Sequence, residues 1–311
     1  MTKGATYPIL GIDIGATSIK FASLLATGEL VSRGSEPVAS GSNEQLIGQL
    51  AGIVARPEFA ECTAVGIGSP GPLDLSGGVI VASANMPGVK NCPLVPELSK
   101  RFSGKQFRLD NDANAATLGE WFFGAGKGAV DLAVFTLGTG VGGGCVFNGR
   151  LQRGFNGNFF EVGHIPVAAF PPGNDLARRC GCGSLGCLET LASATGISET
   201  YYLQTGKRCT AAEIAQRAYE SDAAAVAAYT IAAQALGLAA AMLTQVMNLT
   251  VFIFTGGVAA AANLLKPIIT QTWQEHTLPV FHRQLRITFT LGDEHAGIRG
   301  AAALFLEEQT V

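Results

Sequence analysis

Between Glu161 and Glu189 the chain concentrates residues that can bind a metal. This stretch holds one of the four His and three of the seven Cys in the 311-residue sequence: His164, Cys180, Cys182 and Cys187. Three Cys and one His form the ligand set of a closed tetrahedral zinc site, and Gly residues between the Cys let a short loop fold back on the metal. The sequence therefore predicts a structural zinc ion here.

Each of these Cys could instead pack as a small buried hydrophobe, because Cys is among the most buried residue types. The run Cys180-Gly-Cys182-Gly-Ser-Leu-Gly-Cys187 has three Gly between its Cys residues, and this spacing favours zinc over simple burial. Glu161 and Glu189 flank the ligand set without being needed for it. We therefore expect the metal to fix a loop whose carboxylates have another task.

Two turns of small residues are candidates for phosphate binding. Apolar residues alternate on both sides of Gly15-Ala16-Thr17 and again on both sides of Gly138-Thr139-Gly140, and each pattern predicts a strand, a tight turn and a second strand. Such tips expose backbone N–H groups that can bind phosphate oxygens, although ordinary hairpins also carry small residues. Their recurrence, once in each half of the chain, indicates a duplicated architecture with both turns facing a shared cleft.

A polar corner follows the predicted strand that begins at Phe107. Asp110, Asn111, Asp112 and Asn114 stand together where this strand gives way to a helix. Asp112 could simply cap that helix, but capping does not require the rest of the corner. The cluster indicates a site, because a carboxylate at a helix start stays ionised.

A pair of glycines ends another predicted strand. The apolar run from Val251 to Thr255 leads into Gly256-Gly257. These residues would let a flat ring approach the backbone closely, and an ordinary strand-to-helix turn is the alternative.

Length and composition set the frame for these motifs. A chain of 311 residues predicts two domains with a core each. The net charge of -3 and a pI of about 5.8 give no indication of a basic surface that would bind nucleic acid. Seven Cys, three of them assigned to a metal, argue against a disulfide framework, and the apolar run from Ile9 stops at Asp13, so we expect a cytoplasmic protein. Residues 223–265 carry no charge, but their polar and glycine interruptions favour a buried helix and strand over a membrane span.

Seven segments resemble, in order, the signatures of the ROK family of sugar kinases. They are Asp13-Ile-Gly15-Ala16-Thr17, Gly68-Ser-Pro-Gly71, Asn111-Asp112-Ala-Asn-Ala-Ala, Gly138-Thr-Gly-Val-Gly-Gly-Gly, Glu161-Val-Gly-His164, the run from Cys180 to Glu189, and Gly256-Gly257. The resemblance extends from about residue 9 to residue 303 and is most specific in the Cys-rich loop. It implies an α/β fold of the actin-like, hexokinase-like (ribonuclease H-like) kind, with two domains around a cleft. It also implies ATP-dependent phosphorylation of a hexose, usually at the 6-hydroxyl.

The resemblance implies roles for individual residues as well. Asp112 would be the catalytic base. The hexose would be held by Gly71, Asn111, Asp112, Glu161, His164 and Glu189. ATP and Mg2+ would be held by Asp13, Gly15, Ala16, Thr17, Lys20, Gly138, Thr139, Gly140, Gly256 and Gly257, with Asp13 reaching Mg2+ through water. Structural Zn2+ would be held by His164, Cys180, Cys182 and Cys187.

For the architecture we expect a smaller N-terminal domain over residues 1–115 and a larger C-terminal domain with the zinc loop over residues 116–296. The last helix, at about 297–311, should pack back on the first domain. The expected partners are a sugar and a nucleotide, with neither nucleic acid nor membrane, and many relatives form homo-oligomers, so a dimer is expected.

Glucose is the first substrate expected, because residues 85–94 resemble the corresponding stretch of glucokinases. Allose, fructose, mannose and N-acetylhexosamines stay open. Ala16 replaces a Gly that is usual in the family, and Phe159-Phe160 replaces Ala-Gly before Glu161, which could reshape the sugar pocket. Two other classes compete with a kinase. A sugar-responsive repressor would need a DNA-binding domain before Ile9, and a zinc-dependent interaction module would not need Asp112 or the phosphate turns.

Overall fold

The chain folds into two compact α/β units in this computed structural model, which describes residues 8–15, 17–83, 86–168, 176–290 and 295–307. Unit 1 comprises residues 1–130, 146–159 and 294–311, and unit 2 comprises residues 131–145 and 160–293. Residue 115, where we expected the first domain to end, lies inside helix α3 (Asp112–Phe123), and all of this helix belongs to unit 1.

Unit 1 is built on a five-stranded sheet with the order β3-β2-β1-β4-β8. Its strands are β1 (Ile9–Ile14), β2 (Ser18–Leu24), β3 (Leu30–Pro37), β4 (Ala64–Ser69) and β8 (Gln106–Asn111). Strand β2 runs antiparallel to β1 and β3, whereas β1, β4 and β8 are parallel. The carboxyl ends of the three parallel strands therefore lie along one edge of this sheet.

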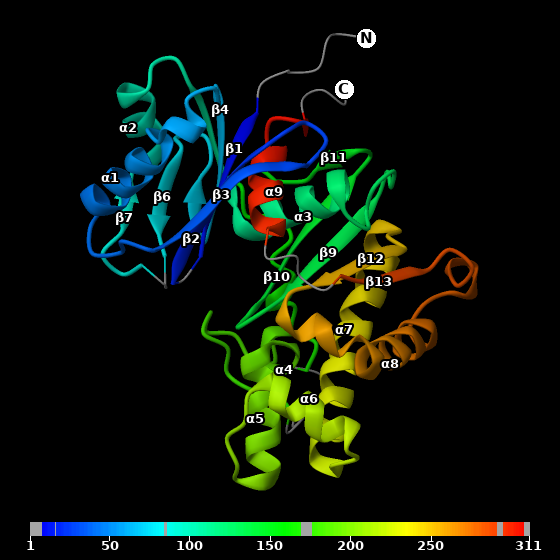
Figure 1. The fold of residues 1–311 in the computed structure, drawn as a ribbon. Coiled ribbons are helices and arrows are strands. Elements are labelled where there is room, and N and C mark those ends of the chain that lie inside the picture. Colours follow the sequence, from blue (N-terminus) through cyan, green and yellow to red (C-terminus); the bar gives the residue numbers. More distant parts are fainter. Residues whose placement is uncertain (1–7, 16, 84–85, 169–175, 291–294, 308–311) are drawn as a thin grey trace. The chain divides into compact units, whose positions relative to one another are not determined.

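Helices cover both faces of this sheet (Figure 1). The first face packs against α1 (Asn43–Val54), which Ser42 caps and which buries Leu46, Leu50 and Ile53, and against α2 (Leu94–Arg101). Beside them are a short 3-10 helix (Pro57–Phe59) and a small sheet of β5 (Leu73–Asp74), β6 (Val79–Ala82) and β7 (Lys90–Cys92).

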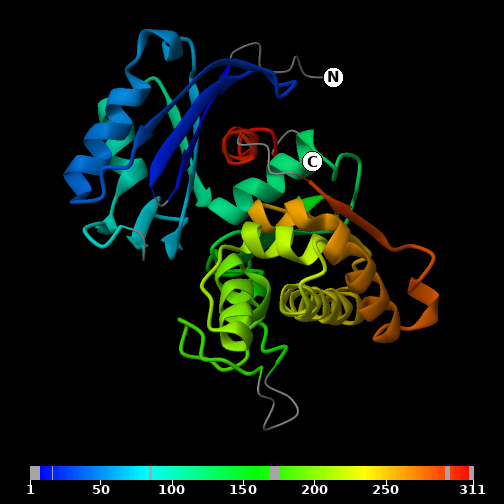
Figure 2. The ribbon, with the colours of Figure 1, turned by 60° about the horizontal axis from the view of Figure 1, so that its bottom comes forward.

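The other face carries α3 and the C-terminal helix α9 (Ala296–Ala303), which lie side by side in Figures 1 and 2. Side chains would prevent this close approach, because a Cβ on Gly300 would collide with the backbone of Ala115, and one on Gly66 with the backbone of Ala301. The Gly and Ala residues of the last helix thus allow it to pack tightly on unit 1.

Unit 2 contains most of a second five-stranded sheet, with the order β11-β10-β9-β12-β13. Its strands are β9 (Leu132–Leu137), β10 (Val141–Phe147), β11 (Arg150–Leu151), β12 (Val251–Thr255) and β13 (Arg286–Phe289). Strand β11 and the end of β10 belong to unit 1. Strand β12 is parallel to β9 and β13, so that the carboxyl ends of β9 and β12 again share an edge.

The helices of unit 2 lie between strands β11 and β13 in the chain. They are α4 (Glu189–Ala192), α5 (Ala194–Thr205), α6 (Ala211–Tyr219), α7 (Ala223–Met247) and α8 (Ala262–Glu275), with 3-10 helices at Val162–His164, Gly257–Ala261 and Pro279–Phe281. Helices α7 and α8 pack side by side (Figure 2). Among the described residues, α7 alone is long and apolar enough to cross a membrane by length and composition, and 56% of its most apolar window is buried. The predicted buried helix, followed by the buried strand β12, is confirmed.

Candidate functional site

In unit 1, three residues that the sequence predicts for the site lie where the parallel strands end: Asp13, Asn111 and Asp112. Asp13 pairs in register with Gly68, Gly68 pairs with Asp110, and Ser69 pairs with Asn111. A Cβ on Gly68 would lie 3.8 Å from Oδ1 of Asp13 and 3.9 Å from Cα of Asp112. Gly68 therefore lies near both Asp13 and Asp112, and a Cβ there would also lie 3.2 Å from Cβ of Ala115.

The polar corner is the start of helix α3. Asn111 is its N-cap, and its Oδ1 accepts a hydrogen bond of 2.9 Å from the N–H of Ala113. Asp112 is the first helical residue, and its Oδ1 accepts from the same N–H at 2.8 Å. Because Asn111 does the capping, the Asp112 carboxyl has capacity left to accept a proton or a further hydrogen bond.

The electrostatics of this edge favour proton uptake. Burial raises the pKa of Asp13 to about 6, the neighbouring Asp112 adds to the rise, and Lys20, opposite Asp13 on β2, lowers it. Asp112 remains accessible to solvent, yet the protein atoms around its carboxyl raise its pKa, against the effect of the Ala113 hydrogen bond. Two carboxyls with raised pKa values indicate a place where a cation or a proton is bound.

The first predicted phosphate turn lies directly beside Asp13. Gly15 donates its N–H to the carbonyl of Ser18 at 2.9 Å, and Thr17, which is exposed, accepts at its carbonyl from Val38 at 3.1 Å. Ala16 lies outside the described residues. On the other side of the corner, a Cβ on Gly71 would be 3.6 Å from Nδ2 of Asn111. Gly71 thus borders the same corner as Asn111.

In unit 2 the second phosphate turn and the Gly pair lie next to each other. Gly138 donates its N–H to the carbonyl of Gly140 at 3.0 Å, which closes the turn after β9. Gly256 follows β12, has a φ of 95°, and passes so close to β9 that a Cβ would lie 2.6 Å from the carbonyl oxygen of Leu137. A side chain at Gly257 would meet nothing within 4 Å. A ligand can therefore approach the backbone at this edge.

Glu189 holds the second turn in place. Its Oε2 accepts a hydrogen bond of 3.0 Å from the N–H of Val141, and a Cβ on Gly140 would collide with this oxygen. The residues that follow help, since the N–H of Ala194 donates to the carbonyl of Gly138 at 2.8 Å and Oγ1 of Thr195 donates to that of Thr139 at 2.9 Å. Glu189 was expected to hold sugar, and its place here also connects the Cys-rich loop to the phosphate turn.

The four predicted metal ligands converge in unit 2. Their ligand atoms all lie within 4.8 Å of one another. Sγ of Cys182 is 3.7 Å from Sγ of Cys187, and Sγ of Cys180 is 3.6 Å from Nδ1 of His164. In a tetrahedral site with metal–sulfur distances of about 2.3 Å, neighbouring sulfurs are about 3.8 Å apart. The cluster thus has the size of a zinc site.

The backbone of the Cys-rich loop makes this convergence possible. The N–H of Cys180 donates to the carbonyl of Ser184 at 2.8 Å, and Gly183 turns the chain with a φ of 93°. Hydrogen bonds from Ser184 lower the pKa of Cys182 to about 6, whereas burial raises the pKa of Cys187 to about 12. A thiolate therefore forms most readily at Cys182, and a bound cation would favour the others.

Glu161 and His164 stand at the two ends of a short 3-10 turn. Glu161 is exposed, whereas Val162 and Gly163 are buried, and a Cβ on Gly163 would collide with the carbonyl of Val141. Before this turn, Phe160 has a φ of 68° and sets its ring edge-on to Phe135, with the centroids 6.3 Å apart. The ring of Phe160 thus packs against the sheet of unit 2.

Comparisons with known proteins agree with this arrangement. The model of the ROK family matches residues 9–308. A glucokinase of Thermotoga maritima is 32% identical over 96% of this chain and 97% of its own, and an N-acetyl-D-glucosamine kinase of Histophilus somni is 32% identical over 95% and 98%. The crystal structure of a ROK family glucokinase from Streptomyces griseus, in complex with glucose and AMPPNP, has a TM-score of 0.76, 28% identity and coverage of 96% and 98%. The expected actin-like, hexokinase-like fold class is confirmed.

Proposed function

This chain belongs to the ROK family, and we propose that it is an ATP-dependent kinase that phosphorylates a hexose at the 6-hydroxyl, with glucose as the first candidate. The observation that carries the proposal is the pair of carboxyls, Asp13 and Asp112, at the carboxyl ends of β1 and β8. Both have raised pKa values, Asp112 contributes to the rise at Asp13, and Gly68 lies near both residues. Such an edge suits a cation, a phosphate and a reacting hydroxyl.

In this proposal Asp112 is the general base. A sugar hydroxyl is a poor nucleophile, and phosphoryl transfer depends mainly on positioning and charge neutralisation. Asp112 is fixed at the start of α3 and would accept the hydroxyl proton as the oxygen attacks the γ-phosphorus. Its raised pKa makes it a better proton acceptor than an ordinary aspartate.

The nucleotide would be bound by backbone and small residues. Gly15, Thr17 and Lys20 in unit 1 and Gly138, Thr139 and Gly140 in unit 2 would face the phosphates, with Ala16 assigned to the first group from the sequence. Gly256 and Gly257 would lie near the adenosine, where a Cβ at position 257 would meet open space. Mg2+, when bound, neutralises phosphate charge, and Asp13 would hold it through water because carboxylate oxygens suit that ion.

The hexose hydroxyls would be held by Asn111, Glu161, His164 and Glu189, with Gly71 bordering the pocket. Each carboxylate can accept two or more hydroxyl hydrogen bonds. Glu189 accepts from the Val141 N–H at Oε2 and from the Cys180 thiol, 3.6 Å away, at Oε1. Zinc binding would deprotonate this thiol and leave Oε1 to accept from a sugar hydroxyl. Losing such a partner would leave a buried hydroxyl unpaired, at a cost of about 1 to 3 kcal/mol.

Zinc would have a structural role. Four protein ligands leave no open coordination position for chemistry, and the observed ligand distances fit such a closed site. Because Glu189 lies two residues after Cys187 and Glu161 three before His164, the metal would orient the two carboxylates from both sides.

A coupled assay for ADP release, run with glucose, allose, fructose, mannose and N-acetylglucosamine, tests the proposal. We expect saturable turnover with at least one of them. A folded protein that binds a hexose but turns none over would instead be a sugar-binding regulator. N-acetylglucosamine is the second candidate, because the relative with that activity is as similar to this chain as the Thermotoga glucokinase.

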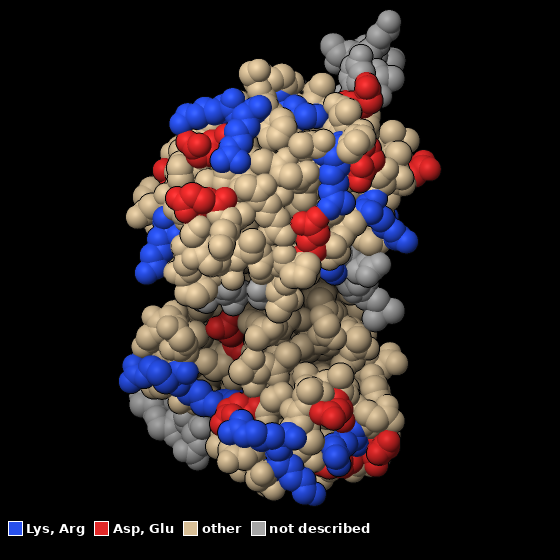
Figure 3. Space-filling view, turned by 60° about the vertical axis from the view of Figure 1, so that its left-hand side comes forward, with Lys and Arg blue, Asp and Glu red and all other residues tan. Residues whose placement is uncertain are grey.

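The proposed partners are a sugar and a nucleotide. Figure 3 shows acidic and basic side chains on one face, with several Lys and Arg side chains in a row along its lower part. We further propose a homodimer and a cytoplasmic location, which gel filtration with light scattering and cell fractionation would test.

A further inference from the structure

An ion-pair network lies behind the Asn111–Asp112 corner, within unit 1. Asp110 is the penultimate residue of strand β8, one residue before Asn111, and its side chain is only 1% exposed. Its Oδ1 accepts two hydrogen bonds of 2.8 Å, one from the N–H of Asn111 and one from Nδ2 of Asn114. Oδ1 of Asp110 therefore binds both Asn111, the N-cap of α3, and Asn114 in the first turn of α3.

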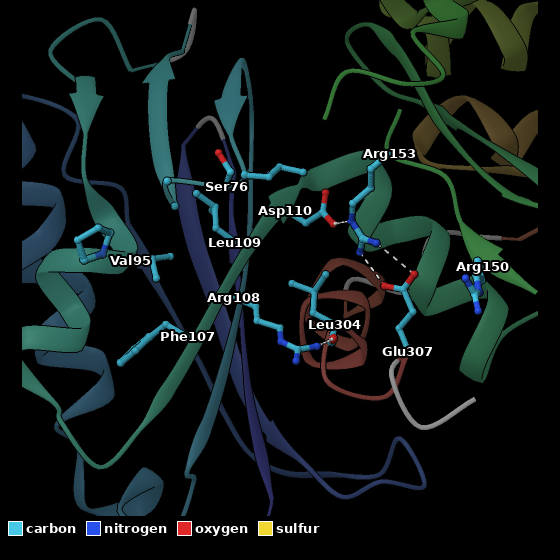
Figure 4. Close-up of a pocket in the computed structure, with 14 residues that line it drawn as sticks. Ser76, Val95, Phe107, Arg108, Leu109, Asp110, Arg150, Arg153, Leu304 and Glu307 are labelled. Carbon is cyan, nitrogen blue, oxygen red and sulfur yellow. Dashed lines mark hydrogen bonds and ion pairs between the residues drawn. The ribbon is translucent and has the colours of Figure 1, made fainter. Parts of the chain in front are cut away.

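The other oxygen of Asp110 is bound by Arg153, a residue that follows β11. Nε of Arg153 donates to Oδ2 of Asp110 at 2.6 Å, and Nη1 and Nη2 donate to Oε1 and Oε2 of Glu307 at 3.1 and 2.7 Å (Figure 4). Burial acts to lower the pKa of Arg153, but its bonds to Glu307 and Asp110 outweigh this and raise it. A permanent cation thus stands against the buried carboxylate.

Arg153 is the cation that pairs with the buried Asp110. A buried carboxylate that loses its cationic partner is left with an uncompensated charge and draws other groups toward it. Such a rearrangement would disturb the oxygen that accepts from Asn111 and Asn114. Because Asp112 is the next residue but one, a displaced corner would move its carboxyl as well.

We propose that Arg153 is a positioning residue that acts through Asp110 to hold Asn111 and Asp112 in their reactive geometry. This inference rests on the proposed function, in which Asn111 binds the hexose and Asp112 accepts its proton. Arg153 itself is not a catalytic residue, since its bonds are to Asp110 and Glu307.

The surroundings of Arg153 make it suitable for substitution. Its side chain is 30% exposed, and with Arg108, Asp110 and Glu307 it lines a cavity of about 700 Å³ in unit 1 (Figure 4). A neutral or shorter side chain at 153 therefore fits without overpacking. Loss of activity then reports on the network rather than on a distorted core.

The primary test compares Arg153→Met, Arg153→Lys and a control, Arg108→Met. Arg108 lies on the same strand as Asp110 and ties it to the carbonyl of Leu304 at 2.6 Å. A misplacement of about 1 Å can cost about 100-fold in rate, so we expect Arg153→Met to lower kcat by about 10- to 100-fold and Arg153→Lys to recover part of it. Arg108→Met should lower Tm with kcat within about twofold of wild type. An equal loss of kcat in both Met variants at equal Tm would overturn the proposal.

A double-mutant cycle tests whether Arg153 acts through Asp110. In Asp110→Asn/Arg153→Met the buried carboxylate and its cation are removed together, Glu307 keeps the hydrogen bond from the Leu151 N–H, and the Asn carbonyl can still accept from Asn111 and Asn114. We expect its kcat to exceed the product of the two single effects, whereas multiplicative effects would overturn the proposal. Should Arg153→Met fail to fold, Arg153→Lys takes its place in the cycle, with Asp110→Asn/Arg153→Lys as the double variant.

Amide NMR keeps this inference separate from the proposed function. The side-chain amide of Asn114 and the backbone amide of Asn111 should shift in Arg153→Met relative to Arg108→Met, whether or not a hexose is turned over. Unchanged resonances would overturn the positioning role. Absence of turnover in the wild-type protein, or full turnover in Asp112→Ala, would instead refute the proposed function.

Discussion

The two units hold their candidate site residues in different ways. In unit 1, strand register and the start of a three-turn helix place Asp13, Asn111 and Asp112, with a buried carboxylate behind them. In unit 2, the described residues of the wall, 161–168 and 176–189, form a 3-10 turn, a Cys-rich loop and the start of the short helix α4. These short segments are held by turns rather than by the continuous hydrogen bonds of a long helix or a sheet, so a metal has more to stabilise there.

From this difference we expect the corner in unit 1 to govern the chemical step and the wall in unit 2 to govern hexose binding. The corner in unit 1 should keep its geometry without zinc, because its hydrogen bonds join Asn111, Asp112 and Asn114 to Asp110 and Ala113, which also belong to unit 1. The wall in unit 2 should lose its geometry when the metal is removed. Substitutions in the corner are therefore expected to affect kcat, and those in the wall to affect binding.

The largest effect is expected for Asp112→Ala. General base catalysis contributes about 10²- to 10⁴-fold, so kcat should fall by that factor while hexose affinity, measured by calorimetry, stays within a few-fold. Asp112→Asn should lose as much, because an amide cannot accept the proton. Near-normal turnover in either variant would remove Asp112 from the mechanism.

The next effect concerns the metal. A Cys180→Ser/Cys182→Ser variant should lose zinc, measured by elemental analysis, and its hexose affinity should fall by about 10- to 100-fold, as is usual when the support of a site is removed. Cys209→Ser, outside the cluster, is the matched control. Loss of zinc with unchanged sugar affinity would show that the wall does not depend on the metal.

A smaller effect is expected at Glu189, where the wall meets the phosphate turn. Glu189→Ala removes the acceptor of the Val141 N–H, worth about 1 kcal/mol, and should raise the KM for ATP about fivefold in addition to that for hexose. Glu189→Gln keeps an acceptor at this position and should raise the KM for hexose alone. If Glu189→Ala left the KM for ATP unchanged, the hydrogen bond from Val141 to Glu189 would not contribute to ATP binding.

The smallest effect is a gain in stability in Asp13→Asn. Asp13 has a pKa of about 6 when folded and an ordinary value near 4 when unfolded. The folded state therefore binds the proton more tightly, and the free energy of unfolding falls as the pH rises from about 4 to about 6 and is constant above that. The upper limit of this loss is about 3 kcal/mol, which partial exposure of Asp13 reduces to about 1 kcal/mol.

Urea denaturation at pH 4 and pH 8 would measure this difference. Asp13→Asn should be more stable than wild type at pH 8 and about equal at pH 4, and it should be impaired in catalysis. If Asp13→Asn and the wild-type protein were equally stable at both pH values, the pKa of Asp13 would not be raised in the folded protein.

Local patterns predicted much of this molecule. Alternating apolar residues around Gly15 and Gly138 placed two strand pairs correctly, because strand periodicity is a local property. The Cys-rich loop was predictable for the same reason, since three of its four ligands lie within eight residues.

Contacts between distant segments were not predictable. Arg153 binds Asp110, 43 residues away, and Glu307, 154 residues away. Glu189 binds Val141, 48 residues away. No periodicity encodes such pairs, because they follow from how the strands and helices pack. The sequence signal for the first pair was Asp110, a carboxylate within the predicted strand that begins at Phe107.

The central claim is that this chain phosphorylates a hexose at the 6-hydroxyl with Asp112 as base. Phosphorus NMR of the wild-type protein with Mg2+, ATP and glucose tests it most directly. The account predicts ADP and hexose 6-phosphate in equal amounts, formed at least about 100-fold faster than by Asp112→Ala. ADP without sugar phosphate, a phosphate on another hydroxyl, or equal rates for both proteins would contradict it.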